Sequence, residues 1–132
     1  MIKNIIFDFG DIFINLDKEV VTREMGRYGG KSVLGSKLHA LNEQYEVGGI
    51  SSEAFLAQLV SVYPNASMAE ITNIWNSILL DFPDHRLQFI EQLAQEAQYR
   101  LFLLSNTNAL HIPHVQDIMG AQKFDRFRNS FE

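Results

Sequence analysis

The chain has 132 residues, with 11 Lys and Arg against 16 Asp and Glu, which gives a formal net charge of -5 and a pI of about 5.3. Hydrophobic residues make up 46% and charged residues 20%, and this composition excludes a disordered or low-complexity chain. The acidic balance gives no electrostatic basis for binding nucleic acid or an anionic membrane. The chain has no cysteine, which excludes disulfides, thiolate metal sites and a cysteine nucleophile. No stretch approaches the length of a membrane span, so we expect a cytoplasmic protein.

The first predicted element is a strand from Lys3 to Phe9. Its centre is a short apolar run, Ile5 to Phe7, and Gly10 follows, a pattern that favours a buried strand. Because residues on both faces are apolar, we expect a parallel strand that is covered on each side. Asp8 directly follows the run, and a carboxylate there is costly unless a metal ion, backbone N–H groups or a cation pairs with it.

From about Asp17 to Asp81 the pattern becomes helical, with short connections and no strand signal. Asp17 can cap a first helix that ends before Gly29, and Ser67 with Glu70 forms a capping box for the last. Apolar residues recur at helical spacing, so we expect four amphipathic helices in a small bundle. The stripes are Leu34, Leu38, Leu41 and Tyr45; Phe55, Leu56, Leu59 and Val60; and Ile71, Ile74, Trp75 and Ile78.

The rest of the chain alternates helix and strand. A fifth helix is predicted to open at Pro83-Asp84, and a second buried strand follows over Leu101–Leu104. A sixth helix is expected from about Leu110 to Met119, with Pro113 in its first turn. The tail from Phe124 to Glu132 fits the start of a third strand. This order predicts an α/β fold with parallel strands, in which ligands bind beyond the carboxyl ends of the strands.

Two polar clusters are therefore predicted at one edge of the sheet. Asp8 ends the first strand, and Gly10 and Asp11 allow a tight turn with N–H groups directed back at the site. Ser105 and Asn106 end the second strand, where a hydroxyl and the N–H groups of a helix start suit a phosphate. An aspartate held in this way can act as a nucleophile toward phosphorus or carbon. The residues alone leave open a plainer interpretation, in which these side chains only begin a turn and a helix.

The two clusters also carry a resemblance to a known family. The segment from Ile5 to Phe13, IIFDFGDIF, resembles the first motif of the haloacid dehalogenase (HAD) superfamily, an apolar strand followed by an aspartate nucleophile. The segment from Leu101 to Asn108, LFLLSNTN, is similar to the second motif, an apolar strand that ends in Ser or Thr. The helical stretch between them resembles the cap that the family inserts after its first motif. The resemblance implies a Rossmann-like parallel-sheet core over residues 1–15 and 82–132, incomplete after the second motif, with a helical cap over residues 16–81.

The resemblance also implies roles for single residues. Asp8 would be the nucleophile and a ligand of Mg²⁺, and the backbone carbonyl of Gly10 would be a second ligand. Ser105 would hydrogen-bond the transferring phosphoryl group, assisted by the backbone of Asn106. The implied function is an Mg²⁺-dependent phosphatase acting on a small phosphorylated metabolite. Dehalogenation by the same nucleophile is the less favoured activity.

Two departures from the family pattern suggest an alternative. Gly10 stands where many family phosphatases carry a second aspartate as general acid, a group typically worth about 10²–10⁴-fold, and Asp11 is one place too far along. The family's third and fourth motifs normally lie beyond the point where this chain ends, and Lys123 is not assigned the role of the third-motif lysine. The alternative is a catalytically silent binding or assembly module. The first strand would keep an open edge, so we expect either a fragment of a longer protein or a homodimer formed through that edge.

Other conspicuous side chains are given plainer interpretations. His111 and His114 are three apart on a predicted helix, and we interpret them as exposed helix-start residues rather than a metal pair because no third ligand is evident. Phe55 and Trp75 are interpreted as core residues rather than substrate-stacking rings. Asp17 is interpreted as a helix cap rather than a substrate contact.

Overall fold

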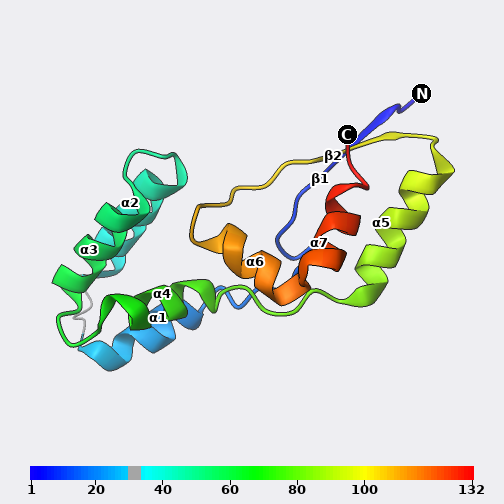
Figure 1. Cartoon of the computed structure of the whole chain (residues 1–132). Helices are drawn as coiled ribbons and strands as arrows, with labels where there is room; N and C mark the ends of the chain where they lie inside the picture. The colour runs from blue at the N-terminus through cyan, green and yellow to red at the C-terminus, as the bar shows by residue number, and fades with distance from the viewer. Residues whose placement is uncertain (30–33) are drawn as a thin grey trace. The chain divides into compact units, whose positions relative to one another are not determined.

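The computed structural model describes residues 1–29 and 34–132, which fold as two compact units (Figure 1). The first unit comprises residues 1–16, 79–106 and 113–132, and the second comprises residues 17–78 and 107–112. No helix in the described part of the chain is long and apolar enough to cross a membrane.

The first unit is built around a two-stranded parallel sheet of β1 (Asn4–Phe7) and β2 (Arg100–Leu103). Phe7 pairs with Leu103 at the end of the ladder, and the Leu104 N–H donates to the Phe7 carbonyl at 2.8 Å. The parallel pairing of strands from distant parts of the chain confirms the predicted α/β class. It also fixes which residues share the carboxyl edge of the sheet.

One face of this sheet is covered and the other is not. Ile5, Phe7 and Leu101 pack into the hydrophobic core of the first unit, whereas the side chain of Ile6 is 64% exposed. The prediction that both faces of the first strand are covered is therefore wrong for the described chain. The reason is that the helices whose residues join this core pack on the face of Ile5 and Phe7, and neighbouring strand residues point to opposite faces.

The helices of the first unit are α5 (Asp84–Glu96), most of α6 (His111–Met119) and α7 (Ala121–Arg128). The Arg126 guanidinium of α7 donates to both carboxylate oxygens of Glu91 on α5, at 2.7 and 2.6 Å. Lys123 of α7 pairs with one carboxylate oxygen, Oδ1, of Asp84 on α5. These ion pairs hold the two helices side by side (Figure 1). Pro113 lies in the first turn of α6, as predicted.

Helix α7 replaces the third strand that the tail was expected to start. Phe124, Phe127 and Phe131 are spaced by three and four residues, which is the helical period, and all three contact the core of the first unit. Gly120, at φ +72°, is the residue that precedes the helix. The strand prediction is wrong. Aromatic residues are common in strands, but here the rings recur at the helical period, and that spacing decides the element.

A cluster of phenylalanine rings forms the centre of the first unit. Phe13 is 1% exposed, and its ring lies 4.8 Å from that of Phe127 and 5.6 Å from that of Phe7. The rings of Phe82 and Phe131 lie 6.4 and 6.0 Å from it. Edge-to-face and offset ring pairs of this kind stabilise beyond the area they bury. The cluster therefore anchors the turn after β1 to the helices beneath the sheet.

The second unit contains α1 (Val20–Met25), a 3-10 turn (Gly26–Tyr28), α2 (Leu34–Glu46), α3 (Ser52–Val62) and α4 (Met68–Asn76). The side chain of Leu34, one member of a predicted stripe, is outside the description. The capping box before α4 is confirmed, and its Ser and Glu side chains each accept from the other residue's backbone N–H. The predicted run of helices is therefore present, with the first one shorter than expected.

Aromatic side chains form the centre of this unit. Phe55 is 0% and Trp75 5% exposed, which confirms that both are core residues. The rings of Tyr45 and Phe55 stack at 4.4 Å, and those of Phe55 and Trp75 meet edge to face at 4.8 Å. His111, from the segment after β2, lies parallel to Trp75 at 5.8 Å. His111 begins α6, as predicted, but it is half-buried, so the interpretation of it as an exposed residue is wrong.

We expect Phe13→Ala to lower the free energy of unfolding by about 3–5 kcal/mol, because it leaves a cavity within the ring cluster. Ile12→Ala is the matched control, since Ile12 is the adjacent residue and is 49% exposed. We expect this variant to lower the free energy of unfolding by about 1 kcal/mol or less, as is usual for a substitution at the surface. Urea unfolding followed by circular dichroism measures both. Equal losses in the two variants would contradict the central place of Phe13.

Candidate functional site

Asp8 stands at the carboxyl end of β1, one residue beyond the last paired position, Phe7. The side chain is exposed, and its Oδ1 accepts a hydrogen bond from the backbone N–H of Phe9 at 2.7 Å. A charge-assisted bond of this kind orients a carboxylate without neutralising it. Asp8 therefore presents a solvent-accessible, positioned carboxylate at the edge where parallel sheets bind ligands.

The turn after Asp8 differs in detail from the predicted one. Asp11, not Gly10, adopts the left-handed conformation, at φ +59°. The N–H of Asp11 donates to the Ile14 carbonyl at 2.8 Å, and the N–H of Phe13 donates to the Phe9 carbonyl at 2.9 Å. The expectation that the Asp11 N–H points back at the site is therefore wrong, because the turn uses it internally. Among the turn's N–H groups, that of Phe9 is the one bonded to Asp8.

Gly10 is suited to its position by size. A Cβ atom built on Gly10 would lie 2.8 Å from Cδ1 of Leu16, closer than such atoms normally approach. Leu16 and Leu79 form an isolated antiparallel bridge where the chain leaves and re-enters the first unit. The absence of a side chain at Gly10 thus lets the turn after Asp8 lie close to Leu16 and its bridge to Leu79.

Ser105 and Asn106 follow β2 on the same edge of the sheet as Asp8, since the two strands run parallel. Ser105 is half-buried and Asn106 is exposed. Helix α6 begins at His111, within one residue of the predicted start at Leu110, so Ser105 and Asn106 do not themselves lie at a helix start. The side chain of Asn108 accepts from the N–H groups of Leu110 and His111 at 3.0 and 2.9 Å. The N–H groups of Leu110 and His111 are therefore occupied, and an anion at Ser105 would be bound by the hydroxyl and the neighbouring backbone.

Other candidates lie outside this edge. Lys123 is paired with Asp84 on α5, in keeping with leaving it out of the site. No cluster of three or more His, Cys, Asp or Glu side chains that could hold a metal occurs among residues 1–29 and 34–132, and so His111 and His114 form no metal centre there. In the described chain the Asp8 carboxylate and the Ser105 hydroxyl therefore follow paired strands at one edge of the sheet.

This donor set is compatible with part of a magnesium site. Mg²⁺ prefers oxygen ligands, and it commonly uses one or two carboxylates together with substrate phosphate and several waters. The exposed carboxylate of Asp8 and the carbonyl of Gly10 are ligands of that kind. A single carboxylate gives such an ion little protein charge, so binding by these residues alone would be weak.

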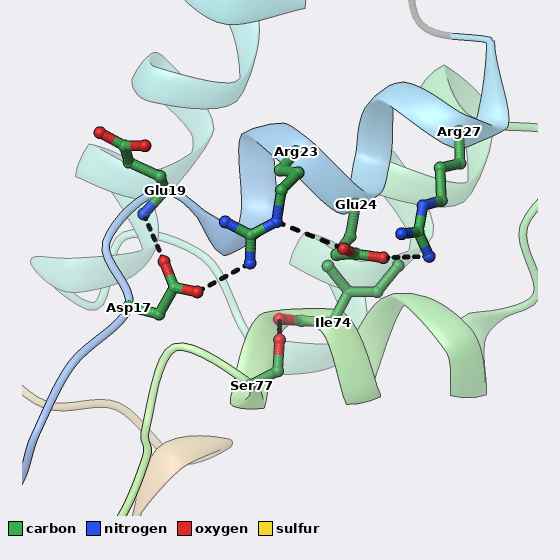
Figure 2. A network of polar contacts seen from close by, with 7 residues as sticks. All are labelled: Asp17, Glu19, Arg23, Glu24, Arg27, Ile74 and Ser77. Atoms are coloured by element: carbon green, nitrogen blue, oxygen red, sulfur yellow. Dashed lines mark hydrogen bonds and ion pairs between the residues drawn. The ribbon is translucent and has the colours of Figure 1, made fainter.

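A second polar cluster surrounds the start of α1 (Figure 2). Asp17 Oδ1 accepts from the N–H of Glu19 at 3.2 Å, and its Oδ2 pairs with the Arg23 guanidinium at 2.7 Å. Glu24 in turn pairs with Arg23 at 3.5 Å and with Arg27 at 2.6 Å. The hydrogen bond from Arg23 holds the pKa of Asp17 below its ordinary value. Asp17 is not the cap residue of α1, a position taken by Glu19; it is held instead by the arginine.

Comparison with known proteins gives relatives of both sequence and structure. No protein-family model matches the chain. The sequence is similar to the D-ribitol-5-phosphate phosphatase of Bacteroides thetaiotaomicron, with 28% identity over 113 residues, which cover 82% of this chain and 54% of that protein. The chain therefore spans about half the length of the curated relative that it matches.

The fold is similar to crystal structures of HAD family enzymes. A magnesium complex of such an enzyme from Bacteroides thetaiotaomicron matches with a TM-score of 0.82 and 29% identity, over 99% of this chain and 65% of that one. A complex of that enzyme with magnesium and inorganic phosphate matches with a TM-score of 0.75 and 30% identity, over 89% and 59%. A predicted HAD-like hydrolase from Porphyromonas gingivalis matches with a TM-score of 0.68 and 28% identity, over 94% and 58%.

Fold and relatives together define the class: an α/β protein with a carboxylate at the end of its first parallel strand, followed in the sequence by a helical insertion. In both sequence and fold, the chain is similar to enzymes of the haloacid dehalogenase (HAD) family.

The ion pair of Asp17 predicts a pH dependence of stability. Because folding lowers the pKa of this carboxyl, the pair stabilises the fold above the ordinary carboxyl pKa of about 4 and loses its effect as the pH falls through the folded value. We expect Asp17→Asn to lower the melting temperature at pH 7, and the difference from the wild type to disappear toward pH 2. Glu19→Gln removes a nearby charge without breaking the Arg23 pair. Its melting temperature should differ less from that of the wild type, and this difference should change less with pH. A pH-independent effect of Asp17→Asn in thermal melts would contradict the ion-pair account.

Proposed function

We propose that this chain is the nucleophile-bearing part of an Mg²⁺-dependent phosphatase that acts on a small phosphorylated metabolite. The observation that carries the proposal is the placement of Asp8 and Ser105 at the same edge of one parallel sheet, after paired strands. The relatives support it, since the matched curated protein is a D-ribitol-5-phosphate phosphatase and a matched crystal structure holds magnesium and inorganic phosphate. Dehalogenation by the same nucleophile has no support among them.

In this proposal a carboxylate oxygen of Asp8 attacks phosphorus, and the bond from phosphorus to the substrate oxygen breaks. The substrate leaves as its alcohol after taking a proton from water, because Gly10 offers no acid in the place of a second aspartate. A second water then attacks the aspartyl phosphate, and the proton it releases combines with the hydroxide left by the first water; inorganic phosphate is released and the Asp8 carboxylate is restored. In the free chain the Phe9 N–H holds one carboxylate oxygen at 2.7 Å, and in this proposal the Ser105 hydroxyl with the Asn106 backbone binds the phosphoryl oxygens.

A bound Mg²⁺ would offset the repulsion between the Asp8 carboxylate and the phosphate dianion. Asp8 and the Gly10 carbonyl would hold it from this chain. The donor set found here needs further oxygen ligands, which the substrate phosphate, water and protein outside the described residues can supply.

The second unit is proposed to be the cap that selects the substrate. Its helices surround a hydrophobic core of their own, so the unit can move as a body and exclude water and misfitting substrates. A phosphorylated polyol or sugar is the proposed substrate class, by analogy with the D-ribitol-5-phosphate phosphatase. The net charge of -5 argues against a nucleic-acid substrate.

One observation favours a different function. The described residues offer no cluster of three or more side chains suited to a metal, and this leaves Asp8 as the sole carboxylate assigned to Mg²⁺. On this alternative the chain by itself is a catalytically silent HAD-like module for binding or assembly. Hydrolysis of an aryl phosphate by the purified chain separates the two, because its good leaving group removes the need for a general acid. Phosphate release that depends on Mg²⁺ supports the phosphatase, and none favours the silent module.

The decisive variant for the phosphatase is Asp8→Asn. We expect it to abolish Mg²⁺-dependent release of phosphate from an aryl phosphate and from D-ribitol 5-phosphate, because an amide cannot act as the nucleophile, while the circular dichroism spectrum stays unchanged. Asp11→Asn is the matched control, since it removes a carboxylate from the same turn and Asn tolerates the left-handed conformation. Turnover in the Asp8 variant equal to that of the control would rule Asp8 out as nucleophile.

We propose further that the open edge of the sheet pairs with a second copy of the chain. Among the described residues the sheet consists of β1 and β2, so the outer edge of β1 has no neighbouring strand, and unpaired strand edges favour association with another strand. The side chain of Ile6 on this strand is 64% exposed. Sedimentation equilibrium of the purified chain is expected to give the mass of a dimer. The Ile6→Lys variant is expected to give the mass of a monomer, because a charge on an edge strand disfavours pairing with another strand. A wild-type chain that is monomeric and cooperatively folded would overturn this proposal without affecting the assignment of Asp8.

A further inference from the structure

Two segments of the first unit, one before and one after the helical insertion, are hydrogen-bonded to each other. The chain leaves this unit after residue 16 and re-enters it at residue 79. The N–H of Asn15 donates to the Asp81 carbonyl at 3.0 Å, and the N–H of Leu80 donates to the Asn15 carbonyl at 2.9 Å. Leu16 and Leu79 form the antiparallel bridge beside these bonds. The two segments therefore make a short ribbon within the first unit.

The side chain of Asn15 adds a further bond to this ribbon. Its amide nitrogen Nδ2 donates to Oδ1 of Asp81 at 2.8 Å, so three hydrogen bonds join Asn15 to residues 80–81. A hydrogen bond to an ionised carboxylate is stronger than one between neutral groups. Asn15 is therefore the residue that ties the segment before the insertion to the segment after it.

The ribbon packs on the turn that follows β1. A Cβ atom built on Gly10 would lie 2.8 Å from Cδ1 of Leu16, so the Leu16 side chain lies directly against the Gly10 backbone. Gly10 also forms an isolated bridge with Ile14, whose carbonyl accepts from the Asp11 N–H at 2.8 Å. Ile14 and Leu16 flank Asn15 in the sequence. Both contacts of Gly10 therefore depend on where Asn15 is held.

The placement of Gly10 matters because its carbonyl is the proposed second ligand of Mg²⁺, beside the Asp8 carboxylate. Mg²⁺ requires nearly octahedral coordination with ligand distances of about 2.0–2.1 Å, so a small displacement of a carbonyl weakens its bond to the ion. Groups that hold a metal ligand in place typically change metal affinity by about 10–100-fold. The residues that fix the Gly10 backbone are therefore expected to influence the binding of Mg²⁺.

We propose that Asn15 is a positioning residue for the proposed magnesium site. Its bonds to residues 80–81 fix Ile14 and Leu16, and these two residues fix the backbone of Gly10. Asn15 itself touches neither the substrate nor the metal. The inference rests on the proposed function for the role of the Gly10 carbonyl, whereas the hold of Asn15 on the turn is a property of the free chain.

Hydrogen exchange of the ligand-free chain, resolved to single amides by NMR, tests this hold on the turn. We expect Asn15→Ala to speed exchange of the Asp11 amide, which bonds to the Ile14 carbonyl, by about three- to tenfold, as for the loss of one hydrogen bond. Gln92→Ala is the matched control. It removes another hydrogen bond from an amide to a carboxylate, that of Glu96 at 3.3 Å, within α5 of the same unit. It should leave exchange of the Asp11 amide unchanged.

The same spectra separate a local effect from a general one. If Asn15→Ala speeds exchange in the β-ladder as much as in the turn, the variant is destabilised as a whole and the proposal is overturned. Exchange of the Asp11 amide equal to that of the wild type would overturn it as well.

Reversing the two side chains shows whether this hydrogen bond, rather than the size of the residues, holds the turn. Asn15→Asp places a carboxylate opposite that of Asp81, and like charges in this position repel. It should therefore speed exchange of the Asp11 amide more than Asn15→Ala does. Adding Asp81→Asn restores one donor opposite one acceptor and should return exchange close to that of the wild type. A double variant no slower in exchange than Asn15→Asp would contradict the proposal.

The contact between Leu16 and Gly10 is tested by a double-mutant cycle. Gly10 is not at positive φ, so alanine suits its backbone and only the approach of Leu16 opposes it. Gly10→Ala and Leu16→Ala are each expected to weaken the binding of Mg²⁺. The double variant should lose less than the product of the two single losses, because removing Cδ1 of Leu16 makes room for the new methyl group. Losses that simply multiply would contradict the contact.

Titration with Mg²⁺ in the presence of inorganic phosphate, followed by the NMR shifts of the turn amides, measures the consequence for the metal. We expect Asn15→Ala to raise the apparent Kd of Mg²⁺ by about tenfold, and Gln92→Ala to leave it unchanged. In turnover of an aryl phosphate, Asn15→Ala should raise the Mg²⁺ concentration that gives half the maximal rate. The KM of the substrate at saturating Mg²⁺ should not change.

The outcomes distinguish this proposal from the proposed function. If Mg²⁺ binds and Asn15→Ala matches the wild type in exchange and in Kd, the role of Asn15 is refuted and the proposed function stands. If Mg²⁺ with phosphate does not bind to the wild type, the proposed function fails. Exchange of the Asp11 amide then still decides whether Asn15 holds the turn.

Discussion

The pairing of β1 with β2 is the constraint on which the candidate site depends. These two strands are separated by more than ninety residues of chain, as Phe7 pairs with Leu103, and their parallel alignment brings both carboxyl ends to one edge. Without it Asp8 and Ser105 would be isolated polar residues. The phenylalanine cluster beneath the sheet supports the pairing, because Phe13 ties the turn after Asp8 to the rings of Phe82 and Phe127.

The site is polar, open and chemically incomplete within the described residues. Asp8 has an orienting N–H from Phe9, but Lys123 is committed to Asp84 on α5 and brings no positive charge to the edge. The matched relatives are longer, and this chain covers 54% of the curated one. A carboxylate nucleophile beside a phosphate dianion needs compensating positive charge, so the balance of charge at this edge, rather than the fold, decides between a working phosphatase and a silent module.

The second unit is a separate hydrophobic body, yet the chain enters it twice. The main insertion, residues 17–78, supplies the helices, and residues 107–112 return to them after β2. His111 then completes a row of rings with Trp75 and Phe55.

Local sequence determined the elements whose signals are local. The apolar run before Asp8, the capping box of Ser67 with Glu70 and the stripe that buries Phe55 and Trp75 all act through neighbours within a few residues, so they could be predicted. The uncovered face at Ile6, the left-handed Asp11 and the helical tail around Phe127 could not, because each depends on which distant segment packs against it. The same holds for His111: nothing in its sequence neighbourhood indicates Trp75 as its partner. The sequence by itself thus determined the residue types at the ends of the strands, and only the tertiary structure decided which of them meet, since burial and contact are set by the whole chain.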